Sequence, residues 1–326
     1  MSTASNPDNG TTVLPPKKSR TGLFIGLAVV VIAAIVAAVL IISNLNAPAA
    51  EPEDGAITEG LGSASQPVRI GTVGASEPYW TTFKEAALEE GISVDIIDFA
   101  SYPEPNPALA AGDLDLNQFQ HIVYLGEYEA ANDSGIVPIG STAIYPLGLY
   151  STKYGSVDEI QAGDTVAIPD DPSNLARGLL ILQSAGLVTL DGGGSIFSTL
   201  DEVSADSKVK VTTLDAALTV TSLPDVAAAI INNDFVTDAG LTASDAIAQD
   251  DPSDPNALPY VNIWAANEKD KDNEVLLKLV DIYQNTQAVL DGVQETSGNT
   301  AVFLKIPVAE LEASLTKVIA DNKAQG

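Results

Sequence analysis

The sequence has no cysteine, one histidine and one methionine among its 326 residues. The absence of cysteine excludes a disulfide framework, a thiolate zinc site, a thiol nucleophile and a lipid attached through sulfur. His121 is the single histidine, so an HExxH zinc site cannot form, and neither a GxSxG motif nor a phosphate-binding glycine-rich loop occurs. We therefore expect neither an enzyme nor a bound metal or cofactor.

Basic residues are also scarce. Lysine and arginine together number 15 against 44 aspartates and glutamates, which gives a formal net charge of −29 and a pI near 4.1. So acidic a chain excludes nucleic acid as a partner, because each phosphate contact needs a lysine or arginine that displaces counterions. The only ionisable side chains before residue 43 are Asp8, Lys17, Lys18 and Arg20, so almost all of the acidic residues follow that point.

Residues 21–42 form an uncharged apolar run whose length suits a helix that crosses the roughly 30 Å hydrocarbon core of a bilayer. A cleavable signal peptide is the alternative, since basic residues precede the run and Ala47-Pro48-Ala49 resembles a cleavage site. The run is longer than the apolar region of cleavable signals, which favours an uncleaved signal anchor. We expect a single pass through the cell membrane, with residues 1–20 in the cytoplasm and the rest of the chain outside.

The chain after this run divides into a linker and a folded part. Residues 43–66 contain proline, glycine, alanine and glutamate without apolar periodicity, which predicts a flexible linker. From residue 67 onward, apolar strand patterns alternate with helical stretches, which predicts α/β layers. The predicted strands are residues 68–74, 92–99, 114–119, 165–168, 209–213, 226–231 and 260–266.

The sharpest local motif is DDPSNLAR at residues 170–177, between a predicted strand and an apolar helix. Asp171 is suited to cap that helix and Pro172 to occupy its first position, which leaves the backbone N–H groups of Ser173 and Asn174 free at a positive helix end. Asn174 and Arg177, three residues apart, flank one face of that end and suit a carboxylate. Simple capping with a surface arginine explains the same residues, and both interpretations stay open.

Aromatic residues gather in a second segment. Tyr102, Phe119, His121 and Tyr124 suit the wall of an apolar slot with polar edges, which is the usual make-up of a small-ligand pocket. A lone histidine among aromatic residues also serves purely structural roles, because no second histidine or cysteine joins it as a metal ligand. Neither interpretation is favoured by this segment alone.

A third segment, residues 229–235, ends a hydrophobic strand abruptly in Asn232 and Asn233. In open α/β sheets the ligand lies outside the carboxyl ends of the strands, where an asparagine can donate to a carboxylate or accept from an ammonium group. An asparagine-rich turn explains the segment equally well.

Several long motifs occur in order along residues 67–304. They are PNPALAAGDLDLNQFQH at 105–121, YPLGLYS at 145–151, VAIPDDPSNLARGLLILQSAGL at 166–187, AAAIINNDF at 227–235 and PYVNIWAANEKDKDNE at 259–274, with SGNTAVF at 297–303 as a weaker match. Together they resemble the methionine-binding lipoproteins of the MetQ/NlpA family. That family normally begins with a lipid-modified cysteine, which this sequence lacks, so we expect the helix at 21–42 to be the membrane anchor.

The resemblance implies an α/β fold of the type II periplasmic-binding-protein class, with two lobes and a ligand cleft between them. The chain would cross between the lobes near residues 145–150 and near residues 260–263. Residues 67–148 together with 260–326 would form the first lobe, and residues 149–259 the second.

The resemblance also implies a function, which is to bind methionine (D or L) outside the cytoplasm and deliver it to the permease and ATPase subunits of an ABC importer. Arg177 and Asn174 match the family's carboxylate-binding helix end, and Asn232 matches an asparagine at a strand end. The aromatic cage around the ligand side chain would consist of Tyr102, Phe119, His121 and Tyr124. The alternative is a membrane-anchored amino-acid receptor that is not coupled to transport; adjacent genes for a permease and an ATPase would distinguish the two.

Overall fold

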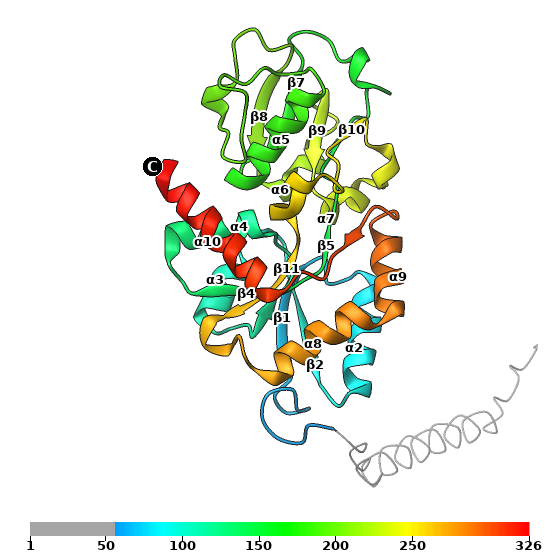
Figure 1. The fold of residues 1–326 in the computed structure, drawn as a ribbon. Coiled ribbons are helices and arrows are strands. Elements are labelled where there is room, and N and C mark those ends of the chain that lie inside the picture. The colour runs from blue at the N-terminus through cyan, green and yellow to red at the C-terminus, as the bar shows by residue number, and fades with distance from the viewer. Residues whose placement is uncertain (1–55, 326) are drawn as a thin grey trace, which may run out of the picture. The chain divides into compact units, whose positions relative to one another are not determined.

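The computed structural model describes residues 56–325, apart from the side chains of residues 255 and 256. Within this range the chain forms two five-stranded sheets, each with its own helices (Figure 1). The elements around one sheet are called the first lobe here, and those around the other the second lobe. The predicted α/β class with two lobes is confirmed.

The first lobe contains a mixed sheet in the order β2-β1-β3-β11-β4. Strands β1, β2 and β3 run parallel, and β11 runs antiparallel to both of its neighbours, β3 and β4. The strands are β1 (Val68–Val73), β2 (Val94–Phe99), β3 (Leu116–Asn117), β4 (Ile136–Ser141) and β11 (Ile263–Asn267).

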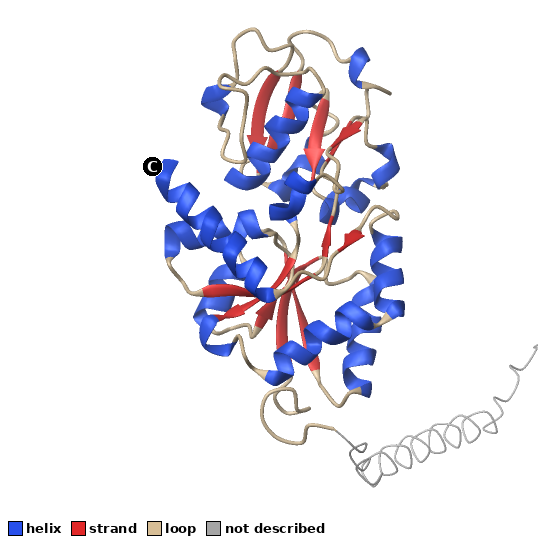
Figure 2. Ribbon diagram, viewed as in Figure 1, coloured by secondary structure: helices blue, strands red, loops and turns tan. Residues whose placement is uncertain are grey.

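Helices cover both faces of this sheet (Figure 2). The two faces can be followed along β11, because successive side chains of a strand point to opposite sides. Trp264 and Ala266 belong to one hydrophobic cluster and Ile263 and Ala265 to another, and all four are fully buried. The first cluster packs against α2 (Pro78–Glu89), α8 (Glu274–Asn285) and α9 (Gln287–Thr296), and the second against α3 (Pro105–Ala111), α4 (Ile122–Asn132) and α10 (Val308–Gln325).

The second lobe contains a sheet in the order β10-β6-β9-β7-β8, with β7 parallel to β8 and β9, and β6 antiparallel to β9 and β10. Its main helix, α5 (Pro172–Ser184), packs on one face against Val166, Ile168 and Ile230. The other elements are β6 (Gly148–Tyr150), β7 (Thr165–Pro169), β8 (Lys210–Leu214), β9 (Ala228–Ile231), β10 (Ala248–Gln249), α6 (Ala216–Thr219) and α7 (Asn233–Val236).

The chain passes between the sheets twice. The first passage runs from β4 through β5 (Ala143–Ile144), which pairs with β12 (Val302–Phe303), to β6. The second runs from β10 to β11. The lobe bounds given above stay a prediction. Short 3-10 helices complete the fold: η1 (Val157–Glu159), η2 (Leu200–Glu202), η3 (Val220–Ser222), η4 (Thr237–Ala239), η5 (Ala243–Asp245), η6 (Pro255–Tyr260) and η7 (Glu268–Asp270).

Each of the seven predicted strands overlaps an observed strand, and the bounds differ most for two of them. The strand predicted at 114–119 shrinks to the two residues of β3, because the chain then leaves the sheet and Phe119 turns toward the space between the lobes. The strand predicted at 260–266 begins only at Ile263, since η6 precedes it and contains Pro259, which has no N–H to donate.

The predicted flexible linker ends earlier than expected. The backbone N–H of Ile57 donates to the carbonyl of Gly91 over 3.0 Å, and Ile57 and Leu61 pack against the hydrophobic core of the first lobe. Ser63 is almost fully buried. Residues 57–66 are therefore part of the folded lobe, which the polar composition of this stretch did not indicate.

The predicted membrane helix at 21–42 and the cytoplasmic tail at 1–20 lie outside the described residues. Within residues 56–325, no helix combines the length and the apolar character needed to cross a bilayer.

Candidate ligand-binding site

A pocket lies between the two sheets, at the carboxyl ends of β7 and β9. Its unfilled space is about 450 Å³, part of it open to solvent. All seven predicted site residues line it, namely Tyr102, Phe119, His121, Tyr124, Asn174, Arg177 and Asn232. Asn233, which the sequence also singled out, lines it as well. Residues that the sequence did not point to complete the lining: Gln120, Tyr145, Pro146, Leu147, Asp234 and Asn262.

The first turn of α5 forms one side of the pocket. Asp171 caps the helix as predicted, since its Oδ1 accepts from the backbone N–H of Asn174 over 3.0 Å. The N–H of Ser173 donates to Glu127 of the first lobe. The prediction of free N–H groups at this helix end was therefore wrong, because two carboxylates of the protein itself occupy the positive end.

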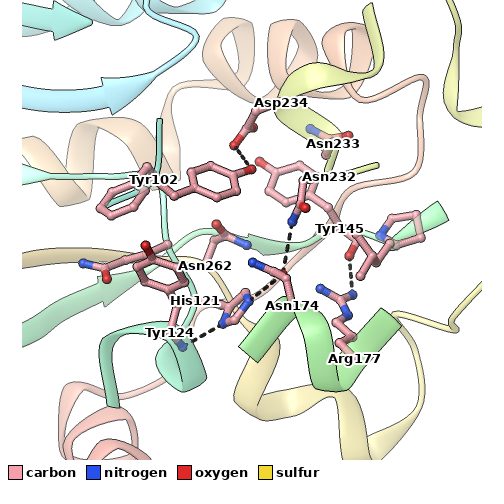
Figure 3. A pocket seen from close by; sticks show the side chains of 14 residues that line it. Tyr102, His121, Tyr124, Tyr145, Asn174, Arg177, Asn232, Asn233, Asp234 and Asn262 are labelled. Atoms are coloured by element: carbon pink, nitrogen blue, oxygen red, sulfur yellow. Dashed lines mark hydrogen bonds between the residues drawn. The ribbon is translucent and has the colours of Figure 1, made fainter. Parts of the chain in front are cut away.

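Asn174 joins residues from both lobes. Its Nδ2 donates to the Asp171 carboxylate over 2.9 Å, and its Oδ1 accepts from Asn232 Nδ2 over 3.1 Å. His121 Nε2 lies 3.4 Å from the same Oδ1 (Figure 3). Since the amide is buried and its orientation is fixed by Asp171, Asn174 presents an acceptor to the first lobe.

His121 has both of the roles that the sequence left open. Its Nδ1 accepts from the backbone N–H of Tyr124 over 3.1 Å and so caps α4, which places the ring proton on Nε2. The ring also lines the pocket and packs edge-on against Tyr260, with centroids 5.2 Å apart. Burial, with a further contribution from the Arg177 charge, lowers the pKa of His121 to about 3. The imidazole is therefore neutral at physiological pH.

Arg177 is buried, so the alternative of a surface arginine was wrong. Its Nε donates to Asp250 Oδ2 over 2.6 Å and its Nη2 to the carbonyl of Tyr145 over 2.8 Å. The guanidinium lies over the ring of Tyr260, 4.5 Å from the centroid. These two hydrogen bonds fix the orientation of the guanidinium through Nε and Nη2. Neither of them uses Nη1.

Aromatic rings form the opposite wall. Tyr102, Phe119 and Tyr124 contact one another with centroids 5.8 to 6.1 Å apart. Tyr102 also reaches across to Phe235 of the second lobe, at 5.2 Å. These rings bring one apolar surface together from both lobes, as expected of a slot for an apolar side chain.

The end of β9 contributes polar groups. The Oδ1 of Asn232 is buried without a hydrogen-bond partner, and such an atom is rare unless a ligand or water satisfies it. Two residues later, Asp234 Oδ2 accepts from the hydroxyl of Tyr102 over 2.8 Å. Burial raises the pKa of Asp234 to about 6.

The lining residues that were missed had weak signals in the sequence. Asn262 is a polar residue inside an apolar strand pattern, and it faces the pocket just before β11 begins (Figure 3). Asp234 followed the two asparagines that were considered. Tyr145 lies in the segment expected to join the lobes, where no side chain was assigned a role.

The geometry is that of an interlobe ligand pocket, and the family model for the NlpA lipoproteins matches residues 68–303. The chain belongs to the NlpA lipoprotein family. A curated relative, the D-methionine-binding lipoprotein MetQ of Yersinia pestis, is 38% identical over 241 residues, which cover 72% of this chain and 87% of the relative.

Solved structures similar to this NlpA-family chain share its two-lobed fold. Protein PG110 from Staphylococcus aureus has a TM-score of 0.73 at 34% identity, and the match covers 77% of this chain and 99% of that one. A nutrient-binding protein from Burkholderia cenocepacia, solved bound to methionine, has a TM-score of 0.67 at 36% identity, with 72% and 99% covered.

Proposed function

We propose that this chain is the extracytoplasmic substrate-binding subunit of an ABC importer and that it binds methionine, D or L, in the pocket between its lobes. The observation that carries the proposal is that seven side chains, chosen from three separate sequence segments, line one pocket in a chain whose relatives are named for methionine binding. The subunit performs no chemistry on its ligand. Permease and ATPase subunits would be its partners.

The arrangement of the pocket suits an amino acid with an apolar side chain. Arg177, oriented by Asp250 and the Tyr145 carbonyl, would pair its Nη1 with the ligand carboxylate. The ring cluster of Tyr102, Phe119 and Tyr124 would pack around the methionine side chain, whose thioether makes favourable contacts with aromatic edges.

Binding would favour closure of the lobes. The carboxylate site lies on α5 of the second lobe, whereas most of the aromatic wall belongs to the first lobe, so a ligand that fills both sites stabilises the closed arrangement. Release would then require the lobes to separate, which gives a permease a means of unloading the ligand.

The segment 21–42 would anchor the chain, with the binding lobes on the outer side of the cell membrane. The support is its uncharged apolar composition and the lack of any cysteine in this sequence to carry a lipid. If cells expressing the chain release it from membranes during alkaline carbonate washing, this form of anchoring is wrong. Retention of the whole chain, and its loss from membranes after deletion of 21–42, are the expected results.

A thermal-shift screen of the twenty amino acids tests the ligand. A ligand that binds only the folded state raises the free energy of unfolding by about 2.7 kcal/mol at 100 times its Kd. We expect methionine to give the largest rise in Tm. A larger rise in Tm with a charged or branched amino acid would support a binding role for the chain but would show that methionine is not its preferred ligand.

A further inference from the structure

Asp234 is a carboxylate that lines the pocket without a basic side chain from the described part of the chain to pair with it. It follows β9 on the second lobe, and it lines the proposed ligand pocket and an adjoining hollow that contains Glu77 and Thr296. In Figure 3 it lies on the opposite side of the pocket from Arg177. Its one cross-lobe hydrogen bond comes from the neutral hydroxyl of Tyr102.

No basic side chain of residues 56–325 forms an ion pair with Asp234. The uncharged groups that face it are the side chain of Asn233, which hydrogen-bonds the carboxylate, and several tyrosines. Its charged neighbour is a second acid, Glu77, whose negative charge opposes the ionisation of Asp234. The tyrosines are Tyr79, Tyr102, Tyr145 and Tyr283. A partly buried carboxylate among such neighbours is destabilised in its charged form, unless a cation from outside the protein joins it.

A second acceptor belongs to the same pocket. Asn232 is more than nine-tenths buried, lines the same pocket, and leaves its Oδ1 without a hydrogen-bond partner while its Nδ2 is held by Asn174. The amide is therefore oriented with its oxygen available. An ammonium group has three N–H donors and no acceptor, so it matches a carboxylate and an amide oxygen placed together.

We propose that Asp234 is the counter-ion of the ligand's α-ammonium group, with Asn232 Oδ1 as a second acceptor. The inference rests on the proposed function and adds to it: the pocket selects ligands that carry both charges of an amino acid. Arg177 recognises the carboxylate, and Asp234 makes the amine a requirement. A ligand of the same shape without the amine leaves Asp234 unpaired and binds weakly.

The alternative role for Asp234 is purely structural, through its bond to Tyr102. Asp234→Asn separates the two roles, because the amide oxygen can still accept from the Tyr102 hydroxyl while the negative charge is removed. The test measures binding of L-methionine and of 4-(methylthio)butanoate, its analogue without the amine, to the full chain and to the variant by calorimetry.

We expect Asp234→Asn to weaken L-methionine binding by about 10- to 100-fold, and to leave binding of the butanoate unchanged or tighter. Equal losses for both ligands would assign Asp234 to the structural role and overturn the proposal, as would no loss for either. Asp206→Asn, which removes one charge at an exposed position of the second lobe, is the matched control and should affect neither ligand.

A wild-type chain that binds no methionine would instead refute the proposed function itself. The two failures are therefore distinguishable, because the inference about Asp234 is tested on the ratio of affinities between the variant and a wild type that binds. Tyr102→Phe adds a second check. It removes the hydroxyl that donates to Asp234 but keeps the carboxylate, so the preference for methionine over the butanoate should persist.

Discussion

At the scale of single residues, the pocket depends on side chains whose orientation is fixed by a partner on the protein. Arg177 is held by Asp250, Asn174 by Asp171 and Asn232 by Asn174. Each is thereby pre-organised, so little side-chain freedom is lost when a ligand binds. The same bonds make conservative substitutions informative.

Arg177→Lys keeps the positive charge but loses the planar guanidinium that binds Asp250, the Tyr145 carbonyl and the ligand together. We expect affinity for methionine to fall by about 100-fold, which corresponds to about 2.7 kcal/mol. Calorimetry on the purified chain measures this. Arg69→Lys is the control, since Arg69 pairs with Asp115, does not line the pocket and has a side chain that is 39% exposed. An equal loss in both variants would show that Arg177 has no special role.

His121 makes stability depend on pH in a predictable direction. Its pKa falls from an unfolded value of about 6.5 to about 3 in the folded chain, so the unfolded state takes up a proton first as the pH drops. The contribution of the neutral ring is complete above pH 6.5 and is lost as the pH falls toward 3. Between pH 7 and 4.5 this removes about 2 to 3 kcal/mol.

His121→Asn lacks this proton uptake but keeps a side chain that can cap α4. We therefore expect the free energy of unfolding, from urea titrations at pH 7 and pH 4.5, to fall by about 2 to 3 kcal/mol more in the wild type than in the variant. Identical losses would mean that His121 is solvated enough to titrate normally in the folded chain.

Sequence reasoning identified the residue types of the pocket better than their partners. The motif DDPSNLAR correctly predicted the Asp171 cap, but it left open whether Arg177 lies at a pocket or on the surface. The motif could not predict that Arg177 Nε would donate to Asp250, which lies 73 positions later in the chain. That pairing depends on where β10 ends. Asp234 was missed for a similar reason: its role depends on the absence of nearby cations, which a sequence does not show.

At the scale of elements, the first turn of α5 contributes both to the stability of the fold and to the ligand pocket. Asp171 accepts from the Asn174 backbone, the Asn174 amide and the Ser173 hydroxyl. Its removal leaves one helix end without a cap and also frees the amide that faces the first lobe. Stability and ligand affinity should therefore change together at this position.

For Asp171→Ala we expect a loss of about 1 to 2 kcal/mol in the free energy of unfolding, together with a fall in methionine affinity of at least about tenfold. Asn273→Ala is the matched control, because Asn273 caps α8 in the same way but lies away from the pocket. It should lose similar stability in urea titrations and keep full affinity. If Asn273→Ala loses affinity as well, the loss of affinity in Asp171→Ala results from lower stability alone.

Strand positions were predicted well where the pattern was long and apolar, as in β1, β7 and β9. No strand was predicted at β4, where Pro138 interrupts the apolar pattern. The strands β5, β6, β10 and β12, which have two or three residues each, were not predicted either. Such short strands exist because neighbouring strands pair with them, so local periodicity cannot reveal them.

At the scale of the whole molecule, the two lobes touch through hydrogen bonds as well as through rings. Besides the bond between Tyr102 and Asp234, the Ser101 hydroxyl of the first lobe donates to Asp215 of the second over 2.7 Å. Both bonds exist only while the lobes are together. They therefore contribute to closure in the same way as a ligand that contacts both lobes.

Ser101→Ala removes one interlobe bond without touching the pocket lining. We expect methionine affinity to fall by about three- to tenfold, because a net hydrogen bond contributes about 1 kcal/mol and its loss favours the open arrangement. Ser207→Ala deletes a hydroxyl bond within the second lobe and should leave affinity unchanged. Titration calorimetry compares the two; a larger effect in Ser207→Ala would argue against closure as part of binding.

The central claim is that the pocket between the lobes binds methionine, and titration of L-methionine into the full-length chain by calorimetry tests it most directly. We predict saturable binding of one ligand per chain with a Kd at or below about 10 µM, equivalent to about −7 kcal/mol. Absence of measurable binding for both L- and D-methionine at about 1 mM, where even an affinity of only −4 kcal/mol would be visible, would contradict the claim.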